Sequence, residues 1–413
     1  MSQWETLRED AQYIIDQALR AAQPDRAVEK ALAETALTEP VTLVAVGKAA
    51  WQMSRAALDA LGGKVRQGIV ITKYGHSRGP LGNLKIFEAG HPVPDENGVR
   101  ATQAALDMVE QLTDRDTVLF LLSGGGSALF EKPLIPLEEL QDINRQLLAC
   151  GADITQINAI RKRLSAVKGG RFAARCGEAR IFCVILSDVL GDQPDMIASG
   201  PACADRSTCA QALEIAEKYR LRLSGQARAL LERETPKQLP NVTVRVTGSV
   251  RQLCAAAQAA CRSRGYAATL LTDRLCCQAR EAGAFLGAIA QTHAGQGKLA
   301  FLAGGETVVR LLGDGKGGRN QELALSAAPY LAGAASALFS IGSDGTDGPT
   351  DAAGGYVDGR TLEKLEKAGC NTEQVLDRND AYTALDAVGG LIRTGPTGTN
   401  VNDVAVLLIR PNE

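Results

Sequence analysis

Short apolar runs alternate along this chain with longer stretches in which apolar residues recur every third or fourth position. The runs Val41–Val46, Thr117–Leu122 and Ile181–Leu186 contain no charge, which is typical of strands buried on both faces of a parallel sheet. Helical spacing precedes or follows them, as over residues 3–22 and 137–148. The alternation predicts βαβ units and a mostly parallel α/β sheet covered by helices.

The same rhythm continues to the end of the chain. It predicts further strands over 68–72, 242–247, 267–272, 298–302 and 404–409, and helices over 154–165, 249–264 and 276–290. The prolines Pro236 and Pro240 interrupt the pattern, and such a cluster favours a linker. Because 413 residues exceed one ordinary core, we predict two α/β domains, over 1–235 and 241–413.

Composition narrows the class of protein. Apolar residues make up 45% of the chain but aromatic ones only 4%, and the net charge is −2. This balance favours α/β layers packed through small residues, with no basic stripe for nucleic acid. The ten cysteines form no CxxC pair, which argues against a zinc ribbon or thioredoxin-like site, and we expect reduced thiols. Without a signal core or a membrane-spanning run, we expect a cytoplasmic protein with no membrane partner.

The most informative segment is a Gly-rich turn that follows the strand 117–122. Glycine adopts positive φ at little cost and lets a ligand approach the backbone. At the carboxyl end of a parallel strand, such a turn points several N–H groups at one spot, and the next helix adds its positive dipole end. A phosphate is the natural occupant, although a turn without a ligand is the alternative. The turn residues are Ser123, Gly124, Gly125, Gly126 and Ser127.

Charged candidates follow the same apolar strands. Lys48 lies near a helix N-terminus, where the dipole disfavours a cation, and this misfit favours a lysine that holds an anion. Asp188 lies at a strand tip, as a general base or Mg²⁺ ligand would. Arg161, Ser165 and Lys168 share one predicted helix face that suits phosphate or carboxylate. The alternatives are a surface lysine, a loop carboxylate and a solvated basic face.

The C-terminal half contains the densest group of polar candidates. Glu306 lies in a Gly-Gly-Glu-Thr turn after the strand 298–302, and Arg319 and Asn320 begin a helix where the guanidinium could bind phosphate or carboxylate. The loop 342–351 offers hard oxygen ligands that suit Mg²⁺ better than zinc, although a polar Asx-turn loop is the alternative. Its metal-ligand candidates are Asp344, Asp347 and Asp351.

Several enzyme classes lack their signatures in this sequence. No GxxxxGK[ST] segment is present, which excludes a P-loop enzyme, and residues 124–129 fail the GxGxxG dinucleotide fingerprint. No HRD or DFG motif of protein kinases occurs. The histidines His76, His91 and His293 show no metal-ligand spacing and leave little room for a Ser-His-Asp triad. For His91 we favour a structural role.

Together these motifs resemble those of the type-2 glycerate kinases, whose C-terminal part is the MOFRL domain. The similarity spans nearly the whole chain. The matching segments are 46–49, 123–129, 161–170 and 187–189 in the N-terminal part, and 304–307, 318–322, 342–351 and 395–403 in the C-terminal part.

This resemblance implies two three-layer α/β/α domains with a cleft between them: a Rossmann-like N-terminal domain and a mixed-sheet domain with the MOFRL region at about 298–410. It implies phosphorylation of D-glycerate with ATP and Mg²⁺, usually to 2-phosphoglycerate. Carried over by matching motif, the implied catalytic residues are Lys48, Asp188 and Arg319. We further predict phosphate binding by the Gly-rich turn and Lys168, and substrate binding by Arg161, Glu306 and Asn320.

Other activities stay open at this point. Members of the family also carry the label hydroxypyruvate reductase, an NAD(P)H-dependent activity, and 3-phosphoglycerate is an alternative product. The failed dinucleotide fingerprint argues against the reductase. A periplasmic-type binding protein would also have two α/β lobes, but the clustered ionic residues and the lack of a signal core disfavour it. A homodimer is compatible with the sequence, which contains no signal for or against one.

Overall fold

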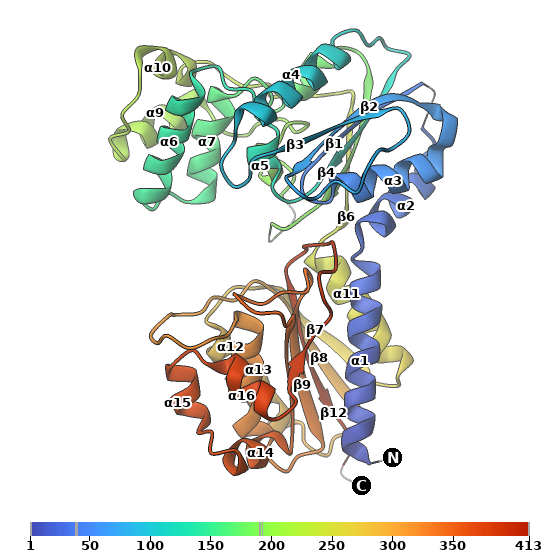
Figure 1. Cartoon of the computed structure of the whole chain (residues 1–413), viewed down its shortest axis with the longest axis vertical. Coiled ribbons are helices and arrows are strands. Elements are labelled where there is room, and N and C mark those ends of the chain that lie inside the picture. Colours follow the sequence, from blue (N-terminus) through green and yellow to red (C-terminus); the bar gives the residue numbers. More distant parts are fainter. Residues whose placement is uncertain (1, 38–39, 190, 192, 412–413) are drawn as a thin grey trace. The chain divides into compact units, whose positions relative to one another are not determined.

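A computed structural model describes residues 2–37, 40–189, 191 and 193–411. The chain forms two compact units, which Figure 1 shows coloured along the sequence. The N-terminal unit is Pro24–Thr247, and the C-terminal unit joins Met1–Gln23 to Gly248–Glu413. None of the described helices is both long and apolar enough to span a membrane.

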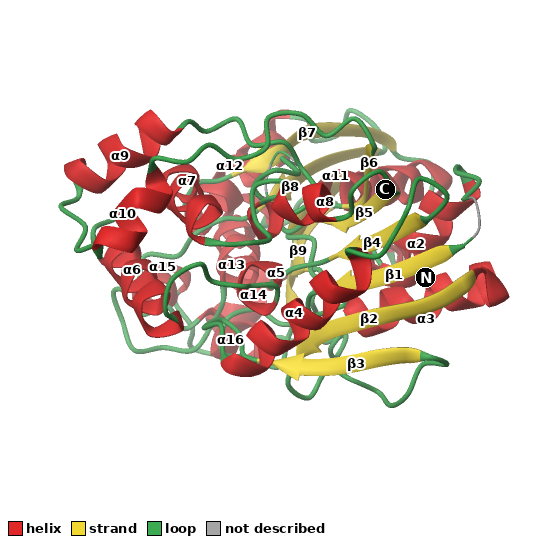
Figure 2. Cartoon of the chain, turned by 90° about the horizontal axis from the view of Figure 1, so that it is seen from above, coloured by secondary structure: helices red, strands yellow, loops and turns green. Residues whose placement is uncertain are grey.

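Six strands form the sheet of the N-terminal unit, in the order β3-β2-β1-β4-β5-β6 (Figure 2). All pairs from β3 to β5 are parallel. The order reverses between β1 and β4, and in doubly wound sheets ligands bind at this switch point, beyond the carboxyl ends of the strands. The strands are β1 Val41–Val46, β2 Val65–Lys73, β3 Leu84–Ala89, β4 Thr117–Leu122, β5 Arg180–Leu186 and β6 Val242–Gly248.

Helices cover both faces of this sheet. Helices α2 (Pro24–Ala33) and α3 (Ala50–Leu61) pack together on one face, and α4 (Glu96–Val109) and α8 (Arg171–Arg175) pack on the other. The sequence pattern predicted this layered parallel fold, and the structure confirms it. The structure differs from the prediction at β6. This strand completes the first sheet, although the sequence placed residues from 241 onward in the second domain.

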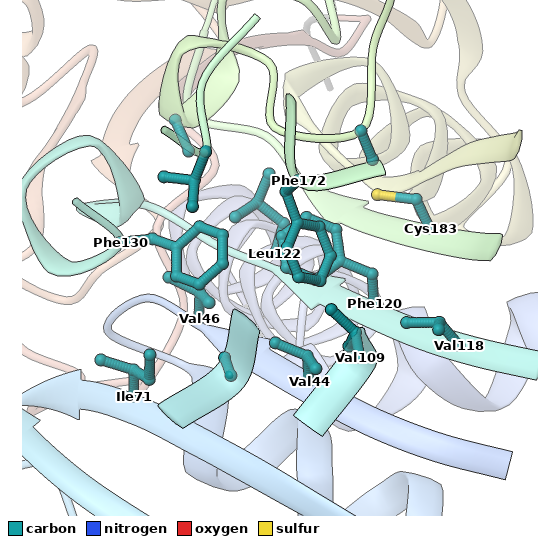
Figure 3. Close-up of a cluster of buried hydrophobic side chains, with 14 of the residues drawn as sticks. Val44, Val46, Ile71, Val109, Val118, Phe120, Leu122, Phe130, Phe172 and Cys183 are labelled. Carbon is teal, nitrogen blue, oxygen red and sulfur yellow. The ribbon is translucent and has the colours of Figure 1, made fainter. Parts of the chain in front are cut away.

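The core over the second face anchors the Gly-rich turn (Figure 3). The rings of Phe120 on β4 and Phe172 on α8 lie 4.8 Å apart, and the ring of Phe130 lies 5.2 Å from that of Phe172. Phe130 directly follows α5 (Gly126–Leu129), the single helical turn that the Gly-rich segment opens. Packing of these three rings therefore fixes both ends of the turn.

A separate helical cluster completes the N-terminal unit. Its four helices pack around their own apolar core, which includes Leu140, Ile160 and Leu231. Two short 3₁₀ segments, η1 (Gly62–Lys64) and η2 (Ile197–Ser199), lie elsewhere in the unit. The clustered helices are α6 Leu137–Ala149, α7 Ile154–Leu164, α9 Cys209–Lys218 and α10 Gly225–Leu231.

The sheet of the C-terminal unit is mixed, as the family resemblance implied. Its order is β11-β10-β9-β12-β8-β7, in which β7 and β8 are parallel and the other neighbours are antiparallel. Its strands are β7 Ala267–Leu275, β8 Leu299–Gly305, β9 Ser336–Gly342, β10 Gly354–Asp358, β11 Leu391–Ile392 and β12 Asp403–Ile409.

The first helix of the chain belongs to this C-terminal unit. Helix α1 (Gln3–Ala21) runs beside α11 (Val250–Ser263) on one face of the mixed sheet (Figure 1). Asp10 of α1 is buried, accepts a hydrogen bond from the Tyr266 hydroxyl at 2.7 Å and pairs with Arg264 at 2.8 Å. The predicted domain over 1–235 therefore differs from the observed unit at its N-terminal end as well.

The other face of the mixed sheet carries the larger helical layer. Helices α12 (Ala279–Thr292) and α13 (Arg319–Leu331) pack against each other and share one apolar core with the sheet. The shorter helices are α14 Thr361–Lys367, α15 Thr372–Asp377 and α16 Ala381–Ala387. All ten cysteines are free thiols, in agreement with the expectation from the sequence.

Candidate active site

The loops after β1 and β4 meet at the switch point of the first sheet. The last residues of these two strands, Val46 and Leu122, are partners in the parallel register. The backbone N–H of Lys48 donates to the carbonyl of Gly124 at 2.9 Å, and the N–H of Ala49 donates to Ser123 Oγ at 3.1 Å. The fold thus brings Lys48 and the Gly-rich turn together, although they are far apart in the sequence.

Two glycines of the turn are in close contact with charged or titratable side chains. A Cβ atom at Gly124 would lie 2.6 Å from Asp188 Oδ2. Gly125 has φ of 89°, in the left-handed region, and a Cβ atom there would lie 3.0 Å from the His91 ring and 3.4 Å from Lys48 Cγ. Only glycine fits such positions without displacing its neighbours. Asp188, His91 and Lys48 therefore surround the turn.

A cavity of about 570 Å³ opens at this point. The turn and Asp188 form part of its wall, and the loop from His91 to Pro94 forms another part. Helices α6 and α7 contribute half of the remaining lining residues. The lining residues that carry charge or hydrogen-bonding groups include Ser123, Ser127, Glu131, Gln141, Asn144, Arg145 and Arg161.

The electrostatics of the site favour an anionic ligand. The half-buried ammonium of Lys48 makes no ion pair or side-chain hydrogen bond with the residues that the structure describes. Burial lowers the pKa of His91, and the neighbouring charge of Lys48 lowers it further, so His91 is neutral near pH 7. Lys48 therefore contributes a positive charge beside the backbone donors of the turn.

Arg161 and Lys168, predicted on one helix face, occupy different environments. Helix α7 ends at Leu164, and Ser165 is extended (φ −119°, ψ 142°), so Lys168 lies beyond the helix. Arg161 lines the cavity and donates from Nε to Asn144 Oδ1 at 2.6 Å, and burial lowers its pKa. The prediction that Arg161, Ser165 and Lys168 share one helix face is therefore wrong.

Lys168 is fully buried behind the turn. Its Nζ donates to the carbonyls of Ser127 at 2.8 Å and Phe130 at 3.0 Å and pairs with Glu131 Oε2 at 3.1 Å. Burial lowers its pKa, while Glu131 opposes that shift. Lys168 is absent from the cavity wall, and its contacts hold the carbonyl side of the turn in place.

The other basic residues of this segment are also buried. Lys162 pairs with Asp205 at 3.0 Å and with Asp195 at 3.6 Å, and Arg163 lies 3.7 Å from Asp205. Both side chains are at most 2% exposed. The alternative of a solvated basic face is therefore wrong for these two residues.

The C-terminal unit gathers a second polar group around Arg319. Its guanidinium binds Asp403 through two hydrogen bonds, from Nε at 2.5 Å and from Nη2 at 2.9 Å, and pairs with Glu306 at 3.2 Å. Glu306 also accepts from Asn402 Nδ2 at 3.1 Å. Burial would lower the pKa of Arg319, but the Asp403 carboxylate outweighs it and raises this pKa. Arg319 therefore remains a cation.

Asp347 caps the start of α13, where Asn320 is the second residue of the helix. The buried Asp347 carboxylate accepts the backbone N–H groups of Asn320 at 3.1 Å and Gln321 at 2.8 Å, as an N-cap does. Burial raises its pKa to about 7, against the opposing effect of these hydrogen bonds. Asn320 is 1% exposed and accepts from Ser340 Oγ at 2.6 Å, so its amide lies in the protein interior.

The three aspartates predicted as metal ligands do not converge. Asp344 accepts the backbone N–H of Thr346 at 3.0 Å, which is an Asx turn, and Asp351 binds the Tyr382 hydroxyl at 2.7 Å. Among the described residues, no group of three or more His, Cys, Asp or Glu side chains is placed to hold a metal ion. The loop thus matches the Asx-turn alternative more closely than a magnesium cage.

Part of the cavity wall could not be predicted from the sequence. Glu131 carried no recognised signal, and the segment around His91 was assigned a structural role. Ala198 and Ser199 have φ of 50° and 62°, which residues with a side chain rarely adopt. A Cβ atom at Gly126 would lie 2.7 Å from the Ala198 Cβ, so this strained segment packs directly on the turn. No feature of the local sequence marks it.

Comparisons with known proteins agree with this architecture. Residues 10–232 match a family described as a domain of unknown function, DUF4147, and residues 299–403 match the MOFRL family. The chain is 50% identical to the D-glycerate 2-kinase of Thermotoga maritima, over 98% of this chain and 99% of that protein. The protein belongs to the glycerate kinase family that contains a MOFRL domain.

A solved member of the family has the same fold. The crystal structure of a Thermotoga maritima glycerate kinase superimposes with a TM-score of 0.95 and covers 98% of this chain and all of that chain. The MOFRL match also agrees with the region predicted at about 298–410. An Agrobacterium vitis relative, 40% identical over 96% of this chain and 93% of that protein, is provisionally named hydroxypyruvate reductase.

Proposed function

We propose that this protein transfers the γ-phosphoryl group of ATP to the 2-hydroxyl group of D-glycerate, giving 2-phosphoglycerate and ADP. The observation that carries the proposal is the 50% identity to a D-glycerate 2-kinase over nearly the full length of both chains. Phosphoryl transfer depends mainly on positioned cations and backbone donors, and the cavity offers both.

The residues of the N-terminal unit have separate roles in this proposal. Backbone N–H groups of Gly124–Ser127 bind nucleotide phosphates, and the ammonium of Lys48 stabilises charge on the migrating group. Asp188 orients the glycerate 2-hydroxyl and accepts its proton. Arg161 binds the glycerate carboxylate. Lys168 acts indirectly, because it holds the Ser127 and Phe130 carbonyls.

Arg319, Glu306 and Asn320 remain proposed participants from the C-terminal unit. The paired carboxylates of Asp403 and Glu306 orient the Arg319 guanidinium, which is suited to phosphate oxygens. Glu306 is proposed to contact substrate. Asn320 is buried, so its proposed contribution is to position the start of α13 next to Arg319.

Magnesium fits this site only as a partner of the nucleotide. Kinases commonly hold Mg²⁺ with one or two carboxylates and the substrate phosphates, and Mg²⁺ then neutralises phosphate charge. Asp188 is the carboxylate next to the phosphate-binding turn and is the proposed ligand. Asp344, Asp347 and Asp351 are dispersed, and we propose no shared ion for them.

The test is to incubate the purified protein with D-glycerate, ATP and Mg²⁺ and to assign the product by ³¹P NMR. We expect ADP together with 2-phosphoglycerate. Formation of 3-phosphoglycerate would contradict the regiochemistry and leave the kinase assignment intact. Oxidation of NADH with hydroxypyruvate, without ADP release from glycerate, would favour the reductase activity that the Agrobacterium relative is named for.

A further inference from the structure

One carboxylate in the cavity wall has an oxygen without a hydrogen-bond donor. Glu131 is 2% exposed, and its Oε2 pairs with Lys168 at 3.1 Å. Its Oε1 is also buried but accepts no hydrogen bond from the part of the chain that the structure describes. Glu131 lines the cavity, and because an unpaired buried polar atom costs free energy, its Oε1 indicates a donor that reaches it when a ligand binds.

A complementary cation lines the same cavity. Arg161 uses Nε to hold Asn144, while its terminal nitrogens make no hydrogen bond to the described residues. These nitrogens have the geometry to bind a carboxylate through two hydrogen bonds. Glu131 and Arg161 also interact electrostatically, since Glu131 opposes the effect of burial on Arg161. The wall therefore offers a cation for a carboxylate and an acceptor for a hydroxyl group.

Lys168 makes Glu131 a suitable acceptor for an anionic substrate. Its ammonium offsets the charge of Glu131, which would otherwise repel a bound carboxylate. The same ammonium donates to the carbonyls of Ser127 and Phe130, so Glu131 is fixed relative to the Gly-rich turn. The acceptor is thereby positioned before the ligand binds.

We propose that Glu131 Oε1 accepts a hydrogen bond from the 3-hydroxyl group of D-glycerate, the hydroxyl that is not phosphorylated, while Arg161 binds the carboxylate. The proposal rests on the proposed function and deepens it, because it makes Glu131 a specificity-determining residue. Lys168 is the positioning residue for Glu131. A site built in this way rejects an analogue without the hydroxyl, because the buried acceptor is then left unpaired.

The test compares D-glycerate with D-lactate, which keeps the carboxylate and the 2-hydroxyl but has a methyl group in place of the hydroxymethyl group. For the wild-type protein we expect kcat/KM for D-lactate to be lower by about 1,000-fold or more, measured as ADP release. Calorimetric binding of the two acids gives a readout that does not require turnover. Equal kcat/KM values for the two acids would overturn the proposal.

The decisive variant removes the acceptor without leaving a buried charge. In Glu131→Met/Lys168→Met both partners of the pair become apolar, an exchange that buried pairs often tolerate. We expect the preference for D-glycerate over D-lactate to fall to about tenfold or less, because the methyl group of D-lactate now meets an apolar wall. An unchanged preference in the folded variant would overturn the proposal.

A matched control is the exposed pair of Arg175 and Glu110, 2.7 Å apart in the same unit and outside the cavity wall. Arg175→Met/Glu110→Met should keep the wild-type preference. If the double variant at Glu131 and Lys168 does not fold, the wild-type comparison of the two acids decides. A wild-type protein that phosphorylates neither acid refutes the proposed function, whereas one that phosphorylates both equally refutes only the role of Glu131.

Discussion

At the scale of single residues, the contact between Gly124 and Asp188 tests the proposed site directly. A methyl group at position 124 would lie 2.6 Å from Asp188 Oδ2, so the carboxylate or the turn must move. We expect Gly124→Ala to lower kcat/KM for D-glycerate by about 100-fold, because a shift of about 1 Å at a reacting group can cost that much. Gly225→Ala, with nothing within 4 Å of the added methyl, should match wild type. Equal kinetics of the two variants would contradict this.

Lys48 gives a second residue-scale prediction. Because its ammonium has no side-chain partner among the described residues, Lys48→Ala should leave stability nearly unchanged. We expect kcat to fall by about 1,000-fold, since the charge acts on the migrating phosphoryl group. Steady-state kinetics and thermal melting measure the two effects. The exposed Lys64 provides the control, and near-wild-type turnover in Lys48→Ala would remove Lys48 from the mechanism.

A candidate site residue is easiest to recognise from the sequence where one segment carries the whole signal. The Gly-rich turn needs no distant partner to be recognised, and it lies beside Lys48 and Asp188 in the structure. The buried ion pair of Lys162 could not be recognised in this way, because its partner Asp205 lies 43 positions further along the chain. A charged side chain in sequence does not reveal whether a counter-ion will be brought to it.

At the scale of elements, α7 depends on that buried ion network. Asp205 is 2% exposed and faces both Lys162 and Arg163. Burial alone would raise the pKa of Asp205, but the Thr235 hydroxyl and Lys162 outweigh it and lower this pKa. We expect Asp205→Asn to reduce the free energy of unfolding of the N-terminal unit by about 3 kcal/mol, because Lys162 and Arg163 lose the buried carboxylate that they share. Lys162 then keeps only the longer contact with Asp195, and Arg163 keeps the contact with the more exposed Glu234.

Urea denaturation followed by Trp51 fluorescence measures this loss, in a Trp4→Phe background that leaves Trp51 as the single tryptophan. Trp51 lies on α3 of the N-terminal unit. The control is Glu110→Gln, which breaks the exposed pair with Arg175 and should cost less than about 1 kcal/mol. A loss for Asp205→Asn as small as that of the control would show that the network does not support α7.

The start of α13 should make the C-terminal unit sensitive to pH. Burial raises the pKa of Asp347 to about 7, above its usual value near 4. Because the pKa of Asp347 is higher in the folded than in the unfolded state, its protonated carboxyl group stabilises the fold below about pH 4. This stabilisation is lost as the pH rises from about 4 to about 7. We expect Asp347→Asn to remove that part of the pH dependence, which amounts to about 4 kcal/mol at most.

The measurement is the difference in unfolding free energy between wild type and Asp347→Asn at several pH values. A Trp51→Phe background leaves Trp4, which lies on α1 and stacks with Arg360 in the C-terminal unit. The difference should change in favour of the variant as pH rises. A difference that is constant from pH 4 to pH 7 would mean that Asp347 does not titrate in this range.

Element prediction followed the same logic as residue prediction. Strands β1 and β4 were found with their observed bounds, because a charge-free run between turns has few other structures to adopt. Strand β3, which is fully buried only at its two end residues, escaped notice because its sequence Leu-Lys-Ile-Phe-Glu-Ala is short and two of its six residues are charged. Helix α4 also escaped, although Asp95 caps it by accepting the Gly98 N–H at 2.9 Å.

At the scale of the whole molecule, chain order and spatial grouping disagree at both ends of the N-terminal unit. Helix α1 joins the C-terminal unit through Asp10, whose partners Arg264 and Tyr266 lie more than 250 positions away. The sequence near residue 23 shows no linker that would announce this. Pro236 and Pro240 predicted a domain boundary, yet β6 follows them and completes the first sheet. Prolines in the sequence thus indicate turns more reliably than domain boundaries.

Each unit has its own apolar core, so a ligand that binds one unit should stabilise that unit against unfolding. We expect the non-hydrolysable ATP analogue AMP-PNP with Mg²⁺ to raise the urea midpoint reported by Trp51, since the phosphate-binding turn belongs to the same unit. At 100 times its dissociation constant, a ligand that binds only the folded state stabilises it by about 2.7 kcal/mol. Gly124→Ala should reduce the shift, while Gly225→Ala should retain it. A Trp51 midpoint that does not move at saturating analogue would contradict the placement of the phosphates on the turn after β4, and a parallel shift of the Trp4 signal would show that the two units unfold as one.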